Sequence, residues 1–252
     1  MTLAIIGGSG LTQLDGLEIE RREMVHTPYG EPSGPLTHGR LHGQPVIFLA
    51  RHGYGHTIPP HRVNYRANIW AMQAAGARQV MAVAAVGGID EGLSPGRLAF
   101  PDQIIDYTHG RASTYHDDDR DAVVHIDFTQ PYDTVLRHQL ITAAKAAGVE
   151  AQNQGCYGAT QGPRLETAAE IRRLARDGCA MVGMTGMPEA ALARELEMPY
   201  ASCAVVANWA AGVRGDEVIG MDQIHETLAV GIQSVRQVLH ALISGMTSPS
   251  PE

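Results

Sequence analysis

The chain has 252 residues, of which 44% are hydrophobic, and its formal net charge at pH 7 is −8. A chain of this length buries a sizeable core, and one α/β domain accounts for it more simply than two smaller domains. Its 19 basic residues are scattered along the chain, which excludes a duplex-binding surface, because such a surface needs clustered Lys and Arg.

Short apolar runs bounded by glycines predict the strands of a central sheet. In chain order these runs are Leu3–Ile6, Val46–Ala50, Val80–Val86, Gly155–Thr160, Ala180–Gly183 and Tyr200–Ala207. Continuous apolar runs of this length are typical of a sheet that is covered on both faces. The pattern therefore predicts an α/β fold in which helices lie on both sides of the sheet.

Helical spacing of apolar residues predicts the covering helices. They are expected at Asn64–Ala75, Tyr132–Ala147, Thr167–Asp177 and from Met221 to Leu242. In the last of these, apolar residues recur every three or four positions, which is the clearest amphipathic pattern in the chain. Pro188 has the place of a first-turn proline, which predicts a strand–loop–helix joint at residues 180–196.

The N-terminal segment and the cysteines indicate the compartment. Three cysteines without a CxxC pair are typical of buried thiols in a reducing cytosol. The chain opens on Leu3–Ile6 without a basic flank or a long apolar stretch, so we expect neither a signal peptide nor a membrane span. A cytoplasmic protein is therefore expected.

Two segments that follow predicted strands suit the binding of an anion. In Ile6–Gly10 the glycines allow a tight turn with exposed N–H groups, and Ser9 adds a hydroxyl. A plain strand-to-loop turn is the alternative there, and the dinucleotide fingerprint fails because Gln13 stands at its third glycine position. After the second strand, Arg51 offers a planar fork of donors suited to phosphate, and His52 offers one more donor.

Further histidines near this segment do not predict a metal site. His56 and His61 follow His52 in a loop that has no nearby carboxylate and no HExxH pattern. We interpret them as loop residues with ordinary hydrogen bonds. The polar run at residues 116–119 is interpreted as a solvated loop, so no metal is expected.

Small residues end the third predicted strand. The segment Ala84–Gly88 allows close approach to a ligand, and the N–H of Ala85 offers a donor to a ligand oxygen. The alternative is tight packing between strands. The binding interpretation requires the three strand ends to converge, as they do at the carboxyl edge of an α/β sheet.

Glu166 and Asn208 are polar residues within otherwise apolar runs. At pH 7 a carboxylate only accepts hydrogen bonds, whereas a carboxamide both donates and accepts. Together they suit the edge of a 6-oxopurine, whose N1–H donates while O6 and N7 accept. The alternatives are that Glu166 caps its helix or pairs with Arg164, and that Asn208 is a turn residue that ends a strand.

From Leu3 to Leu242 the chain resembles the trimeric purine nucleoside phosphorylase and methylthioadenosine phosphorylase family. The resemblance rests on the order and joint presence of Gly7–Leu11, Arg51–Gly53, His61–Asn68, Gly162–Thr167 and Val182–Glu189. It implies a single α/β domain, residues 1–246, in which a mixed and partly barrel-like central sheet is flanked by helices. The polar residues 247–252 are then expected to form a disordered tail.

The family cleaves a nucleoside with inorganic phosphate, which gives a free purine and a ribose 1-phosphate. The resemblance implies that phosphate is held by Ser9, Arg51, His52, the backbone of Ala85, and Thr185. It also implies that Met184 lies against the ribose. Ala84 departs from the pattern, because the methylthioadenosine branch has a hydroxyl residue there. Phosphate is then a co-substrate, and no metal or organic cofactor is expected.

The residues that would contact the purine match the 6-oxopurine branch. The methylthioadenosine branch has Asp at the place of Asn208 and a second Asp two residues later, where this chain has Ala210. A protonatable Asp suits adenine, whereas an Asn amide donates to O6 or N7 of hypoxanthine or guanine. Glu166 is present, as in the 6-oxopurine branch, and would accept from N1–H. Asn208 and Glu166 are therefore expected to stabilise the leaving base.

The start of the last helix is expected, by the same resemblance, to cover the 5′ group of the ribose. Met221 and Ile224 suit a methylthio group, whereas His225 falls near the position that bonds a 5′-hydroxyl in the ordinary nucleoside branch. Core packing is the alternative for Met221 and Ile224. Since the whole chain is nearer the methylthio branch, 5′-methylthioinosine is the expected substrate, with inosine, guanosine or methylthioadenosine as alternatives.

His125 lies in a segment, Val124–Phe128, that resembles one reaching into the site of a neighbouring subunit. This likeness implies a homotrimer whose sites lie at subunit interfaces, with no nucleic acid or membrane as a partner. The alternative is that His125 is an exposed strand residue.

Two other classes of function remain as alternatives. A nicotinamide- or nucleotide-binding oxidoreductase is disfavoured by the missing third glycine of its fingerprint. A non-catalytic nucleoside-binding protein has no need of a phosphate clamp, so phosphate-dependent release of the base separates it from an enzyme.

Overall fold

The computed structural model describes residues 2–117, 122–215 and 220–247. Its strands are β1 (Leu3–Gly7), β2 (Glu18–Glu23), β3 (Leu36–Leu41), β4 (Gln44–Ala50), β5 (Gln79–Gly88), β6 (Leu98–Ala99), β7 (Gln103–Asp106), β8 (Ala151–Gln152), β9 (Cys156–Ala159), β10 (Cys179–Gly183) and β11 (Tyr200–Trp209). Its helices are α1 (Tyr65–Ala74), α2 (Thr134–Ala146), α3 (Ala168–Arg176), α4 (Gly186–Glu195) and α5 (Met221–Thr247), with a 3-10 turn at Pro60–Arg62.

The strands form one mixed sheet. Its main path runs β2-β3-β4-β1-β5-β10-β9-β7, while β11 pairs with β5 and β6, and β6 pairs with β8. Strands β4, β1, β5 and β11 are mutually parallel, whereas β10 runs antiparallel to β5. The predicted α/β class with a mixed central sheet is therefore confirmed.

Strand β5 is shared by three neighbours. Along one edge it pairs with β11 over most of its length. Along the other edge it pairs with β1 at Gln79–Ala82 and with β10 at Gly87–Gly88. Residues 83–86 lie between these two pairings with no strand beside them on that edge in the described chain. The sheet therefore opens at the middle of β5.

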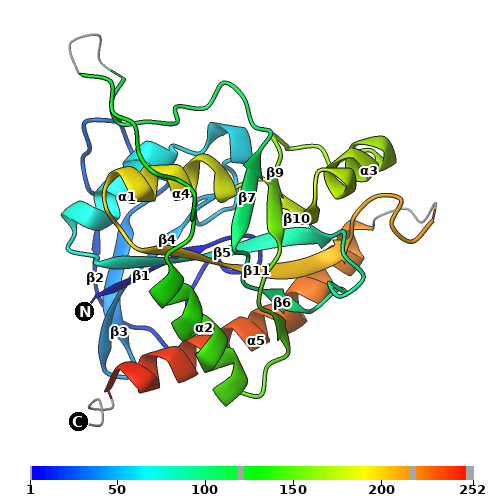
Figure 1. Cartoon of the computed structure of the whole chain (residues 1–252). Coiled ribbons are helices and arrows are strands. Elements are labelled where there is room, and N and C mark those ends of the chain that lie inside the picture. Colours follow the sequence, from blue (N-terminus) through cyan, green and yellow to red (C-terminus); the bar gives the residue numbers. More distant parts are fainter. Residues whose placement is uncertain (1, 118–121, 216–219, 248–252) are drawn as a thin grey trace.

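Two apolar layers cover the sheet, as the continuous apolar strands predict. Helices α1 and α4 lie on one side, and α2 and α5 lie on the other (Figure 1). Side chains of β11 alternate between the layers, so that Ala204 and Val206 join the first core while Cys203 and Val205 join the second. This alternation has the two-residue period of a strand that is buried on both faces.

The helices begin and end on local signals in the sequence. Helix α3 opens with a capping box, in which the Thr167 hydroxyl accepts from the Glu170 N–H while the Glu170 carboxylate accepts from the Thr167 N–H. It is followed by Gly178 at φ +89°, a left-handed conformation that favours glycine after a helix. Met187 has non-helical dihedral angles, so the regular part of α4 begins at Pro188, as its first-turn position predicts.

The six predicted strands and the predicted helices are confirmed, with shifts of a few residues at their ends. The sequence did not predict β2, β3, β6, β7 and β8. Strand β2 has the sequence EIERRE and is almost wholly exposed, so no apolar pattern marks it, and it forms by pairing with β3. Strands β6 and β8 have two residues each, too few to show any period.

Helix α5 extends to Thr247, one residue past the predicted domain boundary. The rest of the predicted tail, residues 248–252, lies outside the described residues, and its disorder stays a prediction. Within the described ranges, none of the helices has the length and apolar character needed to cross a membrane.

Gly231 allows α5 to lie close against β11, and its replacement tests this packing. A Cβ at Gly231 would stand 2.3 Å from Cγ1 of Val205. Helix propensity favours Ala over Gly by about 1 kcal/mol, but overpacking costs about 1–3 kcal/mol. We therefore expect Gly231→Ala to lower the free energy of unfolding, measured by urea denaturation. Gly245, in the same helix, has nothing within 4 Å of its Cβ position, so Gly245→Ala should raise stability; equal shifts in both variants would contradict close packing.

Candidate active site

A cavity of about 780 Å³ lies where β5 is open. It is lined by residues that follow β1 and β4, by the middle of β5, by the ends of β10 and β11, and by the first turns of α5. The three strand ends singled out from the sequence therefore converge. The predicted site residues that line this cavity are Ser9, Arg51, His52, Ala85, Glu166, Met184, Thr185, Asn208, Met221, Ile224 and His225.

The end of β1 and the turn that follows it, beside the cavity, have no room for larger side chains. A Cβ at Gly7 would lie 2.0 Å from the carbonyl oxygen of Leu11, and one at Gly8 would lie 2.6 Å from that of Val83. Real Cβ atoms do not approach backbone this closely, so glycine is required at both positions. The turn after β1 is thereby pressed against β5.

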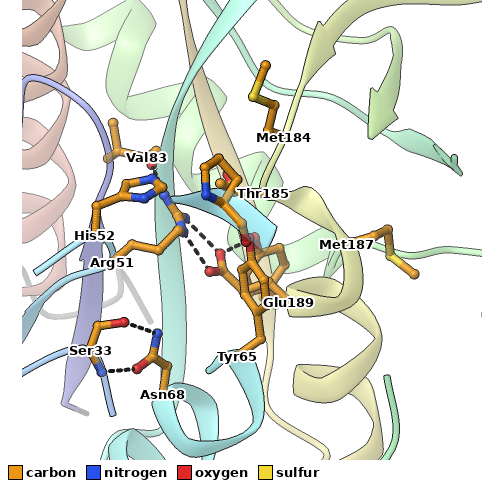
Figure 2. A network of polar contacts seen from close by, with 12 residues as sticks. Ser33, Arg51, His52, Tyr65, Asn68, Val83, Met184, Thr185, Met187 and Glu189 are labelled. Carbon is orange, nitrogen blue, oxygen red and sulfur yellow. Dashed lines mark hydrogen bonds and ion pairs between the residues drawn. The ribbon is translucent and has the colours of Figure 1, made fainter. Parts of the chain in front are cut away.

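Arg51 is buried beneath the cavity and is bound to Glu189 (Figure 2). Its Nε and Nη2 donate to the two carboxylate oxygens at 2.7 and 2.8 Å, and its Nη1 donates to the carbonyl oxygen of Val83 at 2.8 Å. The Tyr200 hydroxyl donates to the same carboxylate at 2.8 Å. The side chains of Arg51 and Glu189 are only 1% and 0% exposed, so a complete ion pair lies out of contact with water.

The ion pair fixes both the charge and the direction of Arg51. Burial disfavours the charged form of the guanidinium, but the adjacent carboxylate of Glu189 outweighs burial and raises its pKa. A guanidinium has five N–H bonds. Three are used within the described chain, which leaves two for an anion in the cavity that Arg51 lines.

His52 is a neutral ring whose tautomer is set by the backbone. Its Nδ1 lies 2.8 Å from the carbonyl oxygen of Ile58, so this nitrogen carries the proton. Burial, followed by the charge of Arg51, lowers the pKa of His52 to about 4. At pH 7 the ring therefore presents Nε2 as an acceptor, whereas the sequence-based expectation gave it the role of a donor.

His56 and Ser9 stand beside His52. The Ser9 hydroxyl lies 3.4 Å from Nε2 of His56, and the rings of His52 and His56 are 4.8 Å apart. Burial, followed by the charge of His225, lowers the pKa of His56. The sequence treated His56 as an ordinary loop residue, but the structure places it in the wall of the cavity.

Glu166 is held by a hydroxyl and not by its helix. The Thr160 hydroxyl donates to Oε1 of Glu166 at 2.5 Å. Arg164 instead pairs with Glu170, and that carboxylate also completes the cap of α3. The alternative in which Glu166 caps the helix or pairs with Arg164 is therefore wrong.

Asn208 lies within β11, at a bulge in its pairing with β5. Its Nδ2 donates to the carbonyl oxygen of Trp209 at 2.7 Å. This bond leaves the amide oxygen and one N–H for a ligand in the cavity. Asn208 is therefore a strand residue, and the alternative of a turn residue is wrong.

The first turns of α5 close the other side of the cavity. Ile224 belongs to the second core as well as to the cavity wall, so core packing is part of its role. Met221 is 57% exposed, which excludes core packing for it. His225 lies near His56, whose pKa it influences.

His125 is the predicted site residue that does not line the cavity. It is exposed and lies outside the strands of the described chain. The alternative described His125 as an exposed strand residue. Its exposure is confirmed, but its position in a strand is wrong. The neighbouring side chains Val123 and Val124 are 81% and 46% exposed.

Arg111 is a residue of this region that the sequence did not single out. Its Nη1 donates to the carbonyl oxygens of Met184 and Met187 at 2.8 and 2.6 Å. Its Nη2 donates to those of Thr160 and Gln161 at 3.3 and 2.9 Å. One side chain thus joins the loop after β9 to the loop after β10. A single arginine in a polar loop carries no pattern that would reveal this role.

Comparison with known proteins identifies the family. A model described as the phosphorylase superfamily matches residues 2–244. The chain belongs to this superfamily. The resemblance and fold predicted from the sequence are therefore confirmed.

No group of three or more His, Cys, Asp or Glu residues in the described ranges could hold a metal ion.

The chain is similar to known proteins over most of its length. A protein of Pseudomonas syringae pv. tomato, "Probable S-methyl-5'-thioinosine phosphorylase", is 53% identical over 96% of this chain and 98% of its own. The "6-oxopurine nucleoside phosphorylase" of Pyrococcus furiosus is 48% identical over 86% and 82%. The structure of methylthioadenosine phosphorylase from Schistosoma mansoni in complex with adenine superposes with a TM-score of 0.92 at 30% identity, covering 99% and 93% of the two chains.

The buried ion pair predicts a large cost for Glu189→Leu. Removal of one partner leaves Arg51 charged and buried, which costs about 3–5 kcal/mol. We expect this loss in the free energy of unfolding, measured by urea denaturation. Arg21→Ala is the matched control, because the Arg21–Glu23 pair is exposed and such pairs contribute little. Similar losses in the two variants would contradict the importance of the buried pair.

The lowered pKa of His52 predicts a dependence of stability on pH. Above its ordinary value of 6.5 the ring is neutral whether folded or unfolded. Between pH 6.5 and about 4 only the unfolded chain takes up the proton, so stability falls as the pH falls, by up to about 1.4 kcal/mol per pH unit. We expect His52→Asn to remove this part of the slope in unfolding measured from pH 7 to pH 4. An unchanged slope would contradict a buried neutral ring.

Proposed function

We propose that the protein catalyses phosphorolysis of a 6-oxopurine nucleoside, with S-methyl-5′-thioinosine as its substrate and hypoxanthine and 5-methylthioribose 1-phosphate as products. The observation that carries this proposal is one cavity lined by two chemically different sets of residues. The first set, Arg51, Ser9 and Thr185, makes up the proposed phosphate end, and the second set, Glu166 and Asn208, makes up the proposed base end. The names of the relatives support the same class of reaction.

The phosphate end combines one charged residue with neutral groups. Two free N–H bonds of Arg51, the hydroxyls of Ser9 and Thr185, and the backbone N–H of Ala85 donate to phosphate oxygens. His52 accepts at Nε2, so its partner is the O–H of hydrogen phosphate. No metal and no organic cofactor takes part, and phosphate is a co-substrate.

The base end distinguishes a 6-oxopurine from a 6-aminopurine. Glu166 accepts from N1–H, and the amide of Asn208 donates to O6 or N7. A 6-aminopurine has a bare N1 that faces the carboxylate and leaves buried polar groups without partners, at a cost of about 1–3 kcal/mol for each group. The same two residues stabilise the negative charge that develops on the leaving base.

The sugar lies between these ends. Met184 packs against the ribose, and Met221 and Ile224 cover the 5′ methylthio group. His225 suits a 5′-hydroxyl, which keeps inosine and guanosine as second candidates. The glycosidic bond breaks through an oxocarbenium-like ribosyl, and the departing base takes up a proton from water at N7. Phosphate held beneath C1′ captures the ribosyl by forming the new C1′–O bond. Positioning of two bound reactants supplies about 7–11 kcal/mol of the barrier reduction.

We also propose that the protein is a cytoplasmic homotrimer. Exposed Val123 and Val124 directly precede His125, and exposed apolar side chains next to each other suit burial against a second copy of the chain. His125 then enters the site of a neighbouring subunit. Light scattering of the purified protein measures the subunit number, and a monomer would contradict this proposal.

A substrate panel tests the proposed function. Base release should require phosphate and should be fastest with S-methyl-5′-thioinosine among methylthioinosine, methylthioadenosine, inosine, guanosine and adenosine. A bound nucleoside without phosphate-dependent release would instead indicate a binding protein. Faster reaction of inosine or guanosine would favour the second candidate.

The same panel tests the role of Asn208. In Asn208→Asp the carboxyl can carry a proton to N7 of adenine and accept from its amino group. We expect the ratio of kcat/KM for methylthioinosine to that for methylthioadenosine to fall by about tenfold or more, since one mismatched hydrogen bond costs about 1–3 kcal/mol. Asn208→Ala is the control that removes contacts without favouring adenine. An unchanged ratio in Asn208→Asp would count against base recognition by this residue.

A further inference from the structure

Thr160 follows β9 directly and makes the hydrogen bond that orients Glu166. Its hydroxyl oxygen lies 2.5 Å from Oε1 of Glu166 and 3.3 Å from the carbonyl oxygen of Gly183. A hydroxyl has one proton to donate. The carboxylate is both closer and charged, so it receives that proton. Oε1 is thereby occupied, while Oε2 has no hydrogen-bond partner among the described residues.

The backbone of Thr160 is itself fixed from two directions. Its N–H donates to the carbonyl oxygen of Gly183 at 2.8 Å, which ties it to the end of β10. Its carbonyl oxygen and that of Gln161 accept from Nη2 of Arg111 at 3.3 and 2.9 Å. The hydroxyl therefore projects from a rigid point, which is the condition for holding a functional side chain in one place.

Arg164 is a second electrostatic partner for Glu166. It is two residues away, and its pKa is raised first by Glu170 and in smaller part by Glu166. Arg164 lies on the exposed surface, where it pairs with Glu170. Glu166 instead accepts from the Thr160 hydroxyl and lines the cavity.

We infer that Thr160 is a positioning residue that determines base specificity: its hydroxyl holds Oε1 of Glu166 so that Oε2 receives the N1–H of a 6-oxopurine. This inference rests on the proposed function, because it assigns the base end of the same cavity. Thr160 does not line the cavity, so its hydroxyl acts through Glu166. Neither a motif nor a spacing marks it, since the contact joins a strand end to a loop.

The test compares Thr160→Val with Thr160→Ser. Valine keeps the shape of threonine and lacks the hydroxyl, whereas serine keeps the hydroxyl. We expect Thr160→Val to weaken hypoxanthine binding, measured by titration calorimetry in the presence of phosphate, by about tenfold or more, as expected for a lost hydrogen bond to a charged group. The kcat/KM for methylthioinosine should fall by a similar factor. The kcat/KM for methylthioadenosine, which has no N1–H, should change by less than about threefold.

Glu166→Ala supplies the background that separates positioning from general damage, because it removes the acceptor of the Thr160 hydroxyl and of N1–H together. If Thr160 acts through Glu166, Thr160→Val should cause no further loss when Glu166→Ala is already present. A loss that persists in that background, or an equal loss in Thr160→Ser, would overturn the inference. So would wild-type behaviour of Thr160→Val.

The outcomes also distinguish this inference from the proposed function. If Glu166→Ala weakens hypoxanthine binding while Thr160→Val does not, the inference fails and base recognition by Glu166 stands. If Glu166→Ala binds hypoxanthine as tightly as the wild type, both fail. If the wild type releases no base with phosphate, the proposed reaction fails, and the calorimetric comparison still decides the role of Thr160.

Discussion

The ion pair between Arg51 and Glu189 holds together the elements that surround the cavity. Arg51 follows β4, Glu189 lies in α4, and the groups that complete their hydrogen bonds come from Val83 in β5 and Tyr200 in β11. A buried ion pair is tolerated only when its remaining donors and acceptors are satisfied. The sequence meets this condition by bringing four separate segments to one point. Each of them is then fixed relative to the others before any ligand arrives.

The opening in the sheet and the ion pair act together. On one edge, β5 pairs with β1 as far as Ala82 and with β10 from Gly87. Between these two pairings, the Arg51 guanidinium donates to the carbonyl oxygen of Val83. The other residues of β5 between the two pairings are Ala84, Ala85 and Val86, which have short side chains. An anion can therefore approach the backbone of β5 closely, beside a cation whose position is already set.

The base end is coupled to this arrangement through the backbone. Thr160 is bonded to Gly183 at the end of β10, and Met184 and Thr185 follow directly in the chain. Arg111 joins the same two loops from the other side. The residues proposed for the base and those proposed for phosphate are thus parts of one rigid frame. This arrangement suits a reaction in which two bound reactants must keep a fixed separation.

Much of the fold could be predicted from the sequence, because buried strands such as β1 and β11 are continuous apolar runs. Strand β2 could not, because its residues are polar and its pairing depends on β3. Sequence motifs predicted most of the residues that line the cavity. They did not predict which other residues these lining residues contact. Glu189 lies 138 residues from Arg51, and no local pattern joins them. The protonation state of His52 likewise depends on burial, which only the folded chain reveals.

The two glycines beneath the cavity limit how this site can vary. Any side chain at Gly7 or Gly8 meets a main-chain oxygen, that of Leu11 in the following turn or that of Val83 in β5. Substitutions meet no such steric limit at Met221, which is largely exposed to solvent. Under the proposed function, new preferences for the sugar substituent can arise there while the proposed phosphate site stays unchanged.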